Sequence, residues 1–267
     1  MKKMHRLYVC LLLGLFSSAQ AAVPPLPAKE NFHLFLLVGQ SNMAGRGLMT
    51  DADNIPPARV LMLNQAGAWV PAAHPLHFDK PKAVGVGLGL TFAEAVAAAQ
   101  PEVTIGLIPC AVGGSPIDSW QPGFYYDATQ SHPWDDALRR AQRALGAGTL
   151  KGILWHQGES DSTPELAQGY AAKLQALVSR LRASLGAPGV PFIVGQMGRF
   201  EGSPWTDYKI QVDRAHRELP EKIAHVAYVS AEGLKDKGDK THFDSASYRE
   251  LGRRYAAAYL RLVAPAK

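Results

Sequence analysis

The chain of 267 residues is poor in cysteine, with only Cys10 and Cys110. Cys10 lies in an N-terminal segment that we expect to be removed, which leaves Cys110 without a partner for an intramolecular disulfide. This excludes the class of small secreted domains that depend on disulfide frameworks. Because Cys110 ends an apolar run, we expect its thiol to be packed in the core.

The chain also lacks an apolar run long enough to cross a bilayer, which takes about 20 residues. At the N-terminus a basic start (MKKMHR) precedes a short apolar run (LYVCLLLGLF) and the small-x-small pattern Ala19-Gln20-Ala21. This order is typical of a secretory signal peptide, and no cysteine stands at the predicted cleavage point to carry a lipid anchor. We therefore expect an exported protein, periplasmic or secreted, with no membrane anchor. The expected segments are a signal peptide (1–21), an extended leader (22–32) and a single domain (33–267).

The chain also has no large excess of positive or negative charge. The formal net charge of +5 includes Lys2, Lys3 and Arg6 of the predicted signal peptide, so removing these three charges leaves +2. Such a balance gives no basic face for nucleic acid. The residues after position 21 show no internal repeat, and their number suits one α/β domain with a full core.

Short apolar runs alternate with helical stretches along this domain, which is typical of a parallel sheet covered by helices on both faces. We expect strands over 33–39, 58–64, 103–110, 151–157, 191–197 and 224–231, with a short return strand after residue 64. We expect helices over 88–100, 133–145, 164–185, 206–218 and from 245–247 onwards, the last one opening on a capping box of Ser247 and Glu250.

Polar residues suited to catalysis follow the ends of these predicted strands. They are Ser41, the pair Gly113-Gly114, Gln157 and the pair Asp239/His242. The carboxyl ends of parallel strands form one rim of the sheet, and ligands bind at that rim. We therefore expect these residues to come together.

Ser41, His242 and Asp239 supply one residue for each role of a serine nucleophile, its base and the carboxylate that orients the base. The alternatives are a serine that only caps a turn and a polar loop that never meets it, and Asp236 and Asp244 compete with Asp239 as carboxylates. The sequence around Ser41 lacks the second glycine of a G-x-S-x-G elbow, which disfavours an ordinary α/β-hydrolase.

The segment WHQGESD contains His156, Glu159 and Asp161, which are possible metal ligands. On a strand-to-loop segment they do not share the face that H-E-x-x-H uses on a helix. We therefore expect no metal and no cofactor. Gln157 as an amide donor toward a developing oxyanion is the more economical interpretation.

The segments GQSNMAGRG, CAVGGSPIDSW, WHQGESD and DKTHF resemble the successive blocks of SGNH-type hydrolases. The most similar branch holds carbohydrate acetylesterases, namely the family-six acetylxylan esterases and sialate O-acetylesterases. The resemblance extends over residues 33–260. It implies a three-layer α/β/α sandwich with a flavodoxin-like, five-stranded parallel sheet.

By this resemblance Ser41 is the nucleophile, His242 the base and Asp239 its partner. The oxyanion hole is formed by the backbone N–H groups of Ser41 and Gly114 with the Gln157 side chain, although the sequence leaves Gly113 open as the glycine donor. We also predict substrate contacts for Gln40, Asn42, Arg46, Glu159 and Trp120.

The sequence thus predicts a serine esterase that removes O-acetyl groups from carbohydrates of the acetylxylan or O-acetyl sialic acid type, through an acetyl-enzyme. Its expected partner is the acetylated carbohydrate. Two alternatives stay open. One is a lipase or thioesterase of the same fold, which would need a long apolar acyl pocket. The other is a non-catalytic glycan-binding protein, which would have no need of the four catalytic residue types.

Overall fold

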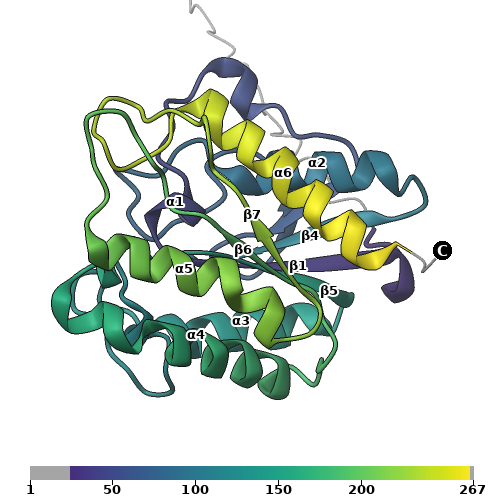
Figure 1. Cartoon of the computed structure of the whole chain (residues 1–267). Coiled ribbons are helices and arrows are strands. Elements are labelled where there is room, and N and C mark those ends of the chain that lie inside the picture. The colour runs from purple at the N-terminus through teal and green to yellow at the C-terminus, as the bar shows by residue number, and fades with distance from the viewer. Residues whose placement is uncertain (1–24, 265–267) are drawn as a thin grey trace, which may run out of the picture.

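The structure, a computed structural model, describes residues 25–264, so the predicted signal peptide lies outside the described residues. A central sheet is covered by helices on both faces, which makes three layers (Figure 1). The strands are β1 (Phe32–Gly39), β2 (Val60–Leu63), β3 (Trp69–Pro71), β4 (Thr104–Pro109), β5 (Thr149–His156), β6 (Phe192–Gly195) and β7 (Val226–Val229). The α-helices are α1 (Ser41–Ala44), α2 (Leu88–Ala99), α3 (Pro133–Leu145), α4 (Pro164–Ser184), α5 (Asp207–Lys222) and α6 (Ser245–Val263).

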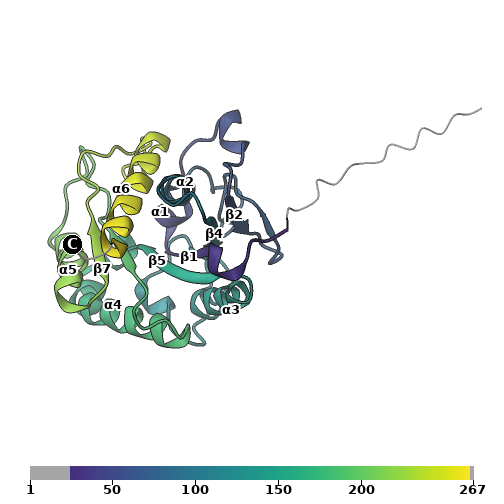
Figure 2. The ribbon, with the colours of Figure 1, turned by 90° about the vertical axis from the view of Figure 1, so that its right-hand side faces the viewer.

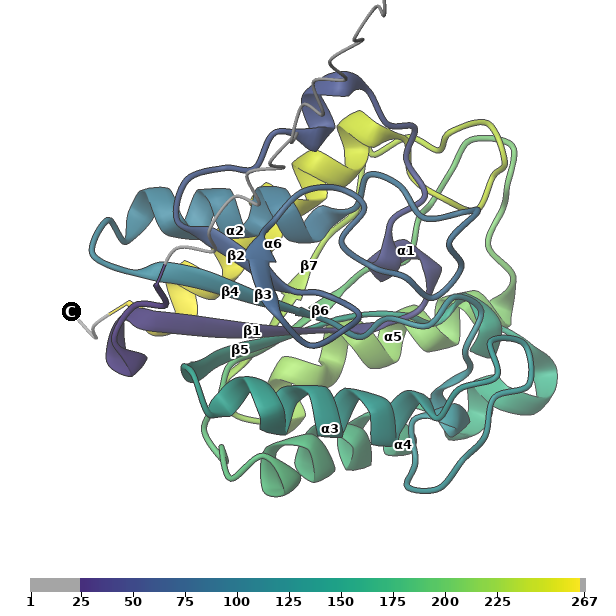
Figure 3. The ribbon, with the colours of Figure 1, turned by 180° about the vertical axis from the view of Figure 1, so that it is seen from behind.

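The sheet has seven strands in the order β3-β2-β4-β1-β5-β6-β7, and every neighbouring pair is parallel except β2 with β3. The predicted number of five is therefore wrong for the whole sheet. The other five strands lie in the spatial order β4-β1-β5-β6-β7. If only these five are numbered along the chain, the order is 2-1-3-4-5, as in flavodoxin. The two additional strands form a hairpin that extends one edge beyond β4 (Figure 3).

Strand β1 lies in the middle of the sheet and is buried on both faces, which explains its continuous apolar sequence. Leu34, Leu36 and Val38 pack in the core beneath α3, α4 and α5, whereas Phe35 and Leu37 pack in the core beneath α2 and α6. All five side chains have no exposed area. Figure 2 shows these two groups of helices on opposite sides of the sheet.

The chain turns sharply where β1 ends, and this turn places Ser41. Gly39 has a φ of +132°, and a Cβ there would lie 2.2 Å from the carbonyl oxygen of His156 on β5. Only glycine tolerates that approach. Gln40 then donates its N–H to the same carbonyl at 2.9 Å, and α1 begins at Ser41.

Two local predictions are wrong at the ends of the domain. The predicted extended leader contains a 3₁₀ turn at Lys29–Asn31, and β1 begins at Phe32. The cap of α6 is Asp244, whose side chain accepts from the Ser247 N–H at 2.7 Å. Ser247 and Glu250 do not form a capping box because Ser247 Oγ accepts from the Lys235 N–H and Glu250 pairs with arginines of its own helix.

The helices of residues 25–264 were also compared with the length and apolarity that a bilayer requires. None of them is long and apolar enough to cross a membrane.

Helices α2 and α6 lie side by side on one face of the sheet, and Gly252 allows this close approach (Figures 1 and 2). A Cβ at Gly252 would lie 2.4 Å from the Leu88 carbonyl oxygen. We expect Gly252→Ala to lower the free energy of unfolding by about 1–3 kcal/mol, because this overpacking outweighs the better helix propensity of alanine.

Gly169→Ala is the matched control for Gly252→Ala. Gly169 also lies inside a helix, but a Cβ there would meet only the flexible Lys173 side chain. This variant should be neutral or more stable by up to about 1 kcal/mol. Urea titration of both variants measures the difference, and equal changes in the two would contradict the packing role of Gly252.

Candidate active site

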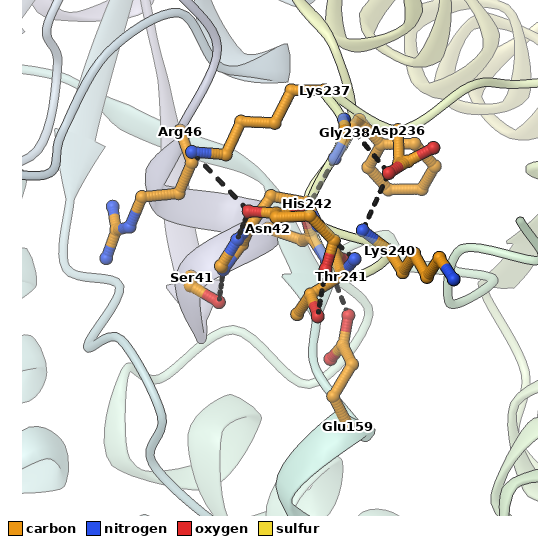
Figure 4. A network of polar contacts seen from close by, with 12 residues as sticks. Ser41, Asn42, Arg46, Glu159, Asp236, Lys237, Gly238, Lys240, Thr241 and His242 are labelled. Carbon is orange, nitrogen blue, oxygen red and sulfur yellow. Dashed lines mark hydrogen bonds and ion pairs between the residues drawn. The ribbon is translucent and has the colours of Figure 1, made fainter. Parts of the chain in front are cut away.

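Ser41, His242 and Asp239 come together at the carboxyl edge of the sheet. His242 Nε2 lies 3.0 Å from Ser41 Oγ, and His242 Nδ1 lies 2.8 Å from Asp239 Oδ2. Ser41 follows the central strand β1, whereas His242 and Asp239 belong to the loop between β7 and α6. Figure 4 shows Ser41 and His242 facing each other across the two segments. The imidazole thus bridges a hydroxyl group and a carboxylate, as a serine nucleophile requires.

The Asp239 carboxylate is held by the loop that carries it. Oδ1 accepts from the backbone N–H groups of Thr241 and His242 at 3.0 and 2.8 Å. Partial burial opposes ionisation, but the hydrogen bonds from the His242 backbone and side chain prevail and lower the pKa of Asp239 to about 2. An ionised carboxylate only accepts, so His242 carries its proton on Nδ1 and presents the lone pair of Nε2 to Ser41.

The two competing carboxylates have other partners. Asp236 accepts from the N–H groups of Gly238 and Lys240 and shapes the turn of the loop. Asp244 caps α6. The geometry therefore pairs His242 with Asp239.

The glycine pair after β4 has two different environments. The Gly113 N–H donates to Asp79 Oδ2 at 2.7 Å, and that carboxylate also pairs with Arg46 at 2.7 Å. The Gly114 N–H makes no hydrogen bond within residues 25–264, and the residue has a φ of +83°. Gly114 is thus the glycine whose N–H is free to serve an oxyanion.

The Gln157 side chain does not point at the site, contrary to its predicted role as an oxyanion donor. It is fully buried, and its Nε2 donates to Asp161 Oδ2 and to the Ser115 carbonyl. Its Oε1 accepts from the Tyr170 hydroxyl at 2.7 Å. Because both neighbours of Nε2 are acceptors, the amide has one sensible orientation, and both its N–H groups are in use.

A series of buried, hydrogen-bonded side chains continues from Gln157 into the core. The Tyr170 hydroxyl lies 2.8 Å from His216 Nε2, and burial lowers the pKa of His216 to about 3, so this imidazole is neutral. Asp161 Oδ2 also accepts from the Ile117 N–H at 2.9 Å. Burial raises the pKa of Asp161 to about 6, although the bonds from Gln157 and Ile117 oppose the shift. These buried side chains support the loops after β4 and β5 from the core side.

Two predicted substrate contacts are wrong because both side chains are fully buried. Trp120 packs edge-to-face on Trp155 in the core and donates its Nε1–H to Ser115 Oγ at 3.0 Å. Asn42 uses its amide within the protein, with Glu159 and Thr241 as acceptors. Neither side chain reaches the cavity beside Ser41.

The other three predicted contact residues do border that cavity. Gln40 is anchored because its Oε1 accepts from the N–H groups of Gly158 and Ser160. Arg46 is buried in its ion pair with Asp79, so its charge is compensated. Glu159 accepts from Asn42 at 2.6 Å.

The cavity has a volume of about 830 Å³ and is open to solvent. Most of the residues that line it are charged or polar, and Leu48, Met49, Ala83 and Val84 add an apolar part to its wall. Sequence reasoning missed Asp79, Lys80, Lys82 and Ser160, which border or support it. Residues 79–82 belong to an irregular segment without strand or helix periodicity, so only the tertiary fold reveals their place.

His156, Glu159 and Asp161, considered above as metal ligands, point to different surroundings. His156 is buried against Tyr255, with 3.0 Å between its Nδ1 and the hydroxyl oxygen, whereas Glu159 borders the cavity. Within residues 25–264 no group of three potential ligands is placed to hold one ion.

A three-layer α/β/α fold with Ser, His and Asp at the carboxyl edge is an arrangement typical of hydrolases. Comparison with known proteins places the chain more narrowly. Residues 31–261 match the profile of a family described as carbohydrate esterase, sialic acid-specific acetylesterase. The chain belongs to this family, and it is a carboxylic ester hydrolase.

Individual relatives agree with this placement. A probable carbohydrate esterase from Arabidopsis thaliana is 34% identical over 256 residues, which cover 88% of this chain and 92% of that protein. The X-ray structure of an Arabidopsis thaliana protein superposes with a TM-score of 0.75 at 32% identity, covering 87% of this chain and 98% of the other. A carbohydrate acetylesterase from Xanthomonas citri shares the fold, with a TM-score of 0.67 at 19% identity over 87% of this chain and 56% of the other.

We expect Gln157→Ala to act on stability before catalysis. The change leaves the Tyr170 hydroxyl, the Ser115 carbonyl and Asp161 with fewer partners in the core, which should cost about 2–4 kcal/mol of unfolding free energy. The kcat of the folded fraction should fall less than about 10-fold, below the loss typical of an oxyanion donor. Gln168→Ala, on the exposed face of α4, is the control. A kcat loss of about 10³-fold at unchanged melting temperature would restore Gln157 to the oxyanion hole.

Asp161 predicts a pH-dependent stability. Its pKa of about 6 lies above the ordinary value of 3.8, so the folded chain binds the proton more tightly than the unfolded chain. The contribution of this group to the free energy of unfolding should rise as the pH falls from above 6 toward 4, by up to about 2–3 kcal/mol. Asp161→Asn keeps an acceptor for Gln157 and Ile117 and should remove this dependence. A constant difference between wild type and variant from pH 8 to pH 5 would contradict the shift.

Proposed function

We propose that this carbohydrate esterase is a serine enzyme that removes O-acetyl groups from its substrate through an acetyl-enzyme on Ser41. The observation that carries the proposal is the continuous hydrogen-bonded series from Ser41 Oγ through His242 to Asp239. A serine hydroxyl is inert at neutral pH without such a base. A glycan-binding protein would not need this series, so the alternative of a non-catalytic role is disfavoured.

The geometry supports a two-step reaction. Ser41 Oγ attacks the acetyl carbonyl carbon while His242 Nε2 takes the hydroxyl proton. The tetrahedral intermediate then collapses, and His242 returns the proton to the departing sugar oxygen, which leaves acetyl-Ser41. Water then attacks the carbonyl carbon of acetyl-Ser41 while His242 Nε2 takes a proton from it. The second intermediate collapses as His242 returns this proton to Ser41 Oγ, and acetate leaves. Asp239 stays ionised throughout and stabilises the imidazolium.

Two backbone N–H groups are suited to the oxyanion. Ser41 is the first residue of α1, so its N–H has no partner within that helix. The Gly114 N–H is free, and the Tyr126 hydroxyl and Lys80 Nζ lie 3.1 and 3.8 Å from where a Gly114 Cβ would be. Donors in fixed positions stabilise the intermediate more than the resting ester, which is the property that raises kcat.

The cavity wall supports a sugar rather than a lipid as the group carrying the ester. A lipase or thioesterase needs a long apolar acyl pocket, whereas charged and polar side chains surround Ser41. Lys80 and Lys82 border the cavity and have no ion pair within the described range, 25–264. Free ammonium groups suit an acetylated sugar that carries a carboxylate, such as an O-acetyl sialic acid, better than neutral acetylxylan. Acetate release from both substrates distinguishes them.

We further propose that the enzyme acts after export, in the periplasm or outside the cell. The support is the N-terminal sequence alone, with its basic start, short apolar run and Ala19-Gln20-Ala21. Edman sequencing or intact mass of protein recovered from the native host's extracytoplasmic fraction, starting at Ala22, would agree with this.

Ser41→Ala should lower acetate release by about 10³-fold or more with little change in stability, since binding and the oxyanion donors remain. His242→Ala should be about as damaging, because the base and the nucleophile act as one unit. Ser179→Ala is the control, because Ser179 lies on the exposed face of α4 and its Oγ donates only to the Gln175 carbonyl of the same helix. Near-wild-type activity of Ser41→Ala, or a trapped acetyl group on another residue, would refute the proposal.

A further inference from the structure

Asn42 follows Ser41 directly and binds the backbone on both sides of His242. Its Nδ2 donates to the Thr241 carbonyl at 3.0 Å, and its Oδ1 accepts from the Phe243 N–H at 3.4 Å. In Figure 4 the Asn42 side chain lies against the segment that carries Thr241 and His242. The residue next to the nucleophile is thus attached to both neighbours of the base.

The remaining hydrogen-bonding capacity of Asn42 is also satisfied. Nδ2 donates to Glu159 Oε1 at 2.6 Å, and Oδ1 accepts from the Tyr248 hydroxyl at 2.7 Å. A side-chain amide has two donor hydrogens and two acceptor lone pairs, and all four are used here. The side chain has no exposed area, so it cannot touch a substrate.

These four bonds connect segments that are distant in sequence. They join α1 to the His242 loop, to the turn after β5 that holds Glu159, and to α6, which holds Tyr248. The other hydrogen bonds of residues 236–243 close that loop mainly upon itself, as from Lys237 N–H to the His242 carbonyl and from Thr241 N–H to Asp239. Apart from the contact of His242 with Ser41 itself, Asn42 is therefore the side chain that hydrogen-bonds this loop beside the nucleophile, while the buried Phe243 ring packs the end of the loop against His156, Phe200 and Tyr248.

We propose that Asn42 is a positioning residue that sets the distance between Ser41 Oγ and His242 Nε2. This inference rests on the proposed function, because it assigns a role within the same reaction. Without Asn42 the loop keeps its internal pairing of Asp239 with His242 but loses its attachment beside Ser41. A misplacement of about 1 Å in such a pair costs up to about 10²-fold in rate.

The test is the rate at which a fluorophosphonate inactivates the full chain, because this reaction reports the nucleophilicity of Ser41 without any sugar. We expect Asn42→Ala to slow inactivation by about 10–10²-fold and to lower kcat by a similar factor. KM for an acetylated sugar should change less than about 3-fold, since Asn42 makes no substrate contact. Asn42→Asp keeps the size of the side chain but replaces both N–H groups by an acceptor facing Thr241 and Glu159, and it should be at least as slow.

A stability control separates positioning from general destabilisation. Leu177→Ala weakens the core beneath α4, on the other face of the sheet from α6, and this core contains none of the four hydrogen-bond partners of Asn42. The inactivation rate of each variant is measured well below its melting temperature. The control variant should react with the fluorophosphonate at the wild-type rate, whereas Asn42→Ala should react more slowly.

The outcomes distinguish this inference from the proposed function. If wild type reacts at Ser41 and Asn42→Ala reacts equally fast, the positioning role is wrong. If Asn42→Ala raises KM at unchanged kcat, Asn42 acts on substrate binding and the inference is overturned. If wild-type Ser41 does not react at all, the proposed function itself fails and the inference fails with it.

Discussion

The pairing of β1 with β4 and β5 is the constraint on which the site depends. These three strands are adjacent and parallel, so the loops that follow them emerge at one edge with Ser41, Gly114 and Glu159. The Gly39 turn against the His156 carbonyl fixes where the chain leaves β1. Since β1 is apolar and buried on both faces, it has no freedom to shift its register without exposing its core residues. The sheet therefore fixes the position of Ser41.

The buried polar groups beneath the site hold its loops in place and take no part in the proposed reaction. Gln157, Asp161, Tyr170 and His216 form a buried, hydrogen-bonded series that does not line the cavity, and within residues 25–264 only Asp161 Oδ1 and His216 Nδ1 of the series have no partner. Asp79 does the same for Arg46 and Gly113 on the other side. Buried polar groups of this kind are costly unless paired, and when paired they specify one arrangement of the loops. The Ser41 hydroxyl and the His242 imidazole face the cavity, together with charged side chains such as Lys80 and Lys82.

The sequence predicted the parts that depend on local pattern. Apolar runs located the strands, and helix periodicity and Pro133 located α3 at its observed bounds. Because Ser41, Asp239 and His242 follow strand ends, the sequence also predicted that they meet at one rim of the sheet. The direction of side chains was not predictable in the same way. Trp120 and Gln157 follow strands too, but neighbours distant in sequence, such as Trp155 and Tyr170, draw them inward. The return strand of the edge hairpin was predicted, whereas the capping box of α6 was not formed because Ser247 Oγ accepts from the Lys235 N–H outside the helix.

The hydrogen bond from Ser41 to His242 joins residues that are 201 positions apart. During synthesis Ser41 leaves the ribosome long before His242, so a partly made chain contains the hydroxyl without its proposed base. On the proposed mechanism the Ser41 hydroxyl is an ordinary alcohol in such a chain. Reactivity would then require nearly the whole polypeptide, and an incomplete chain would not hydrolyse the esters that it meets.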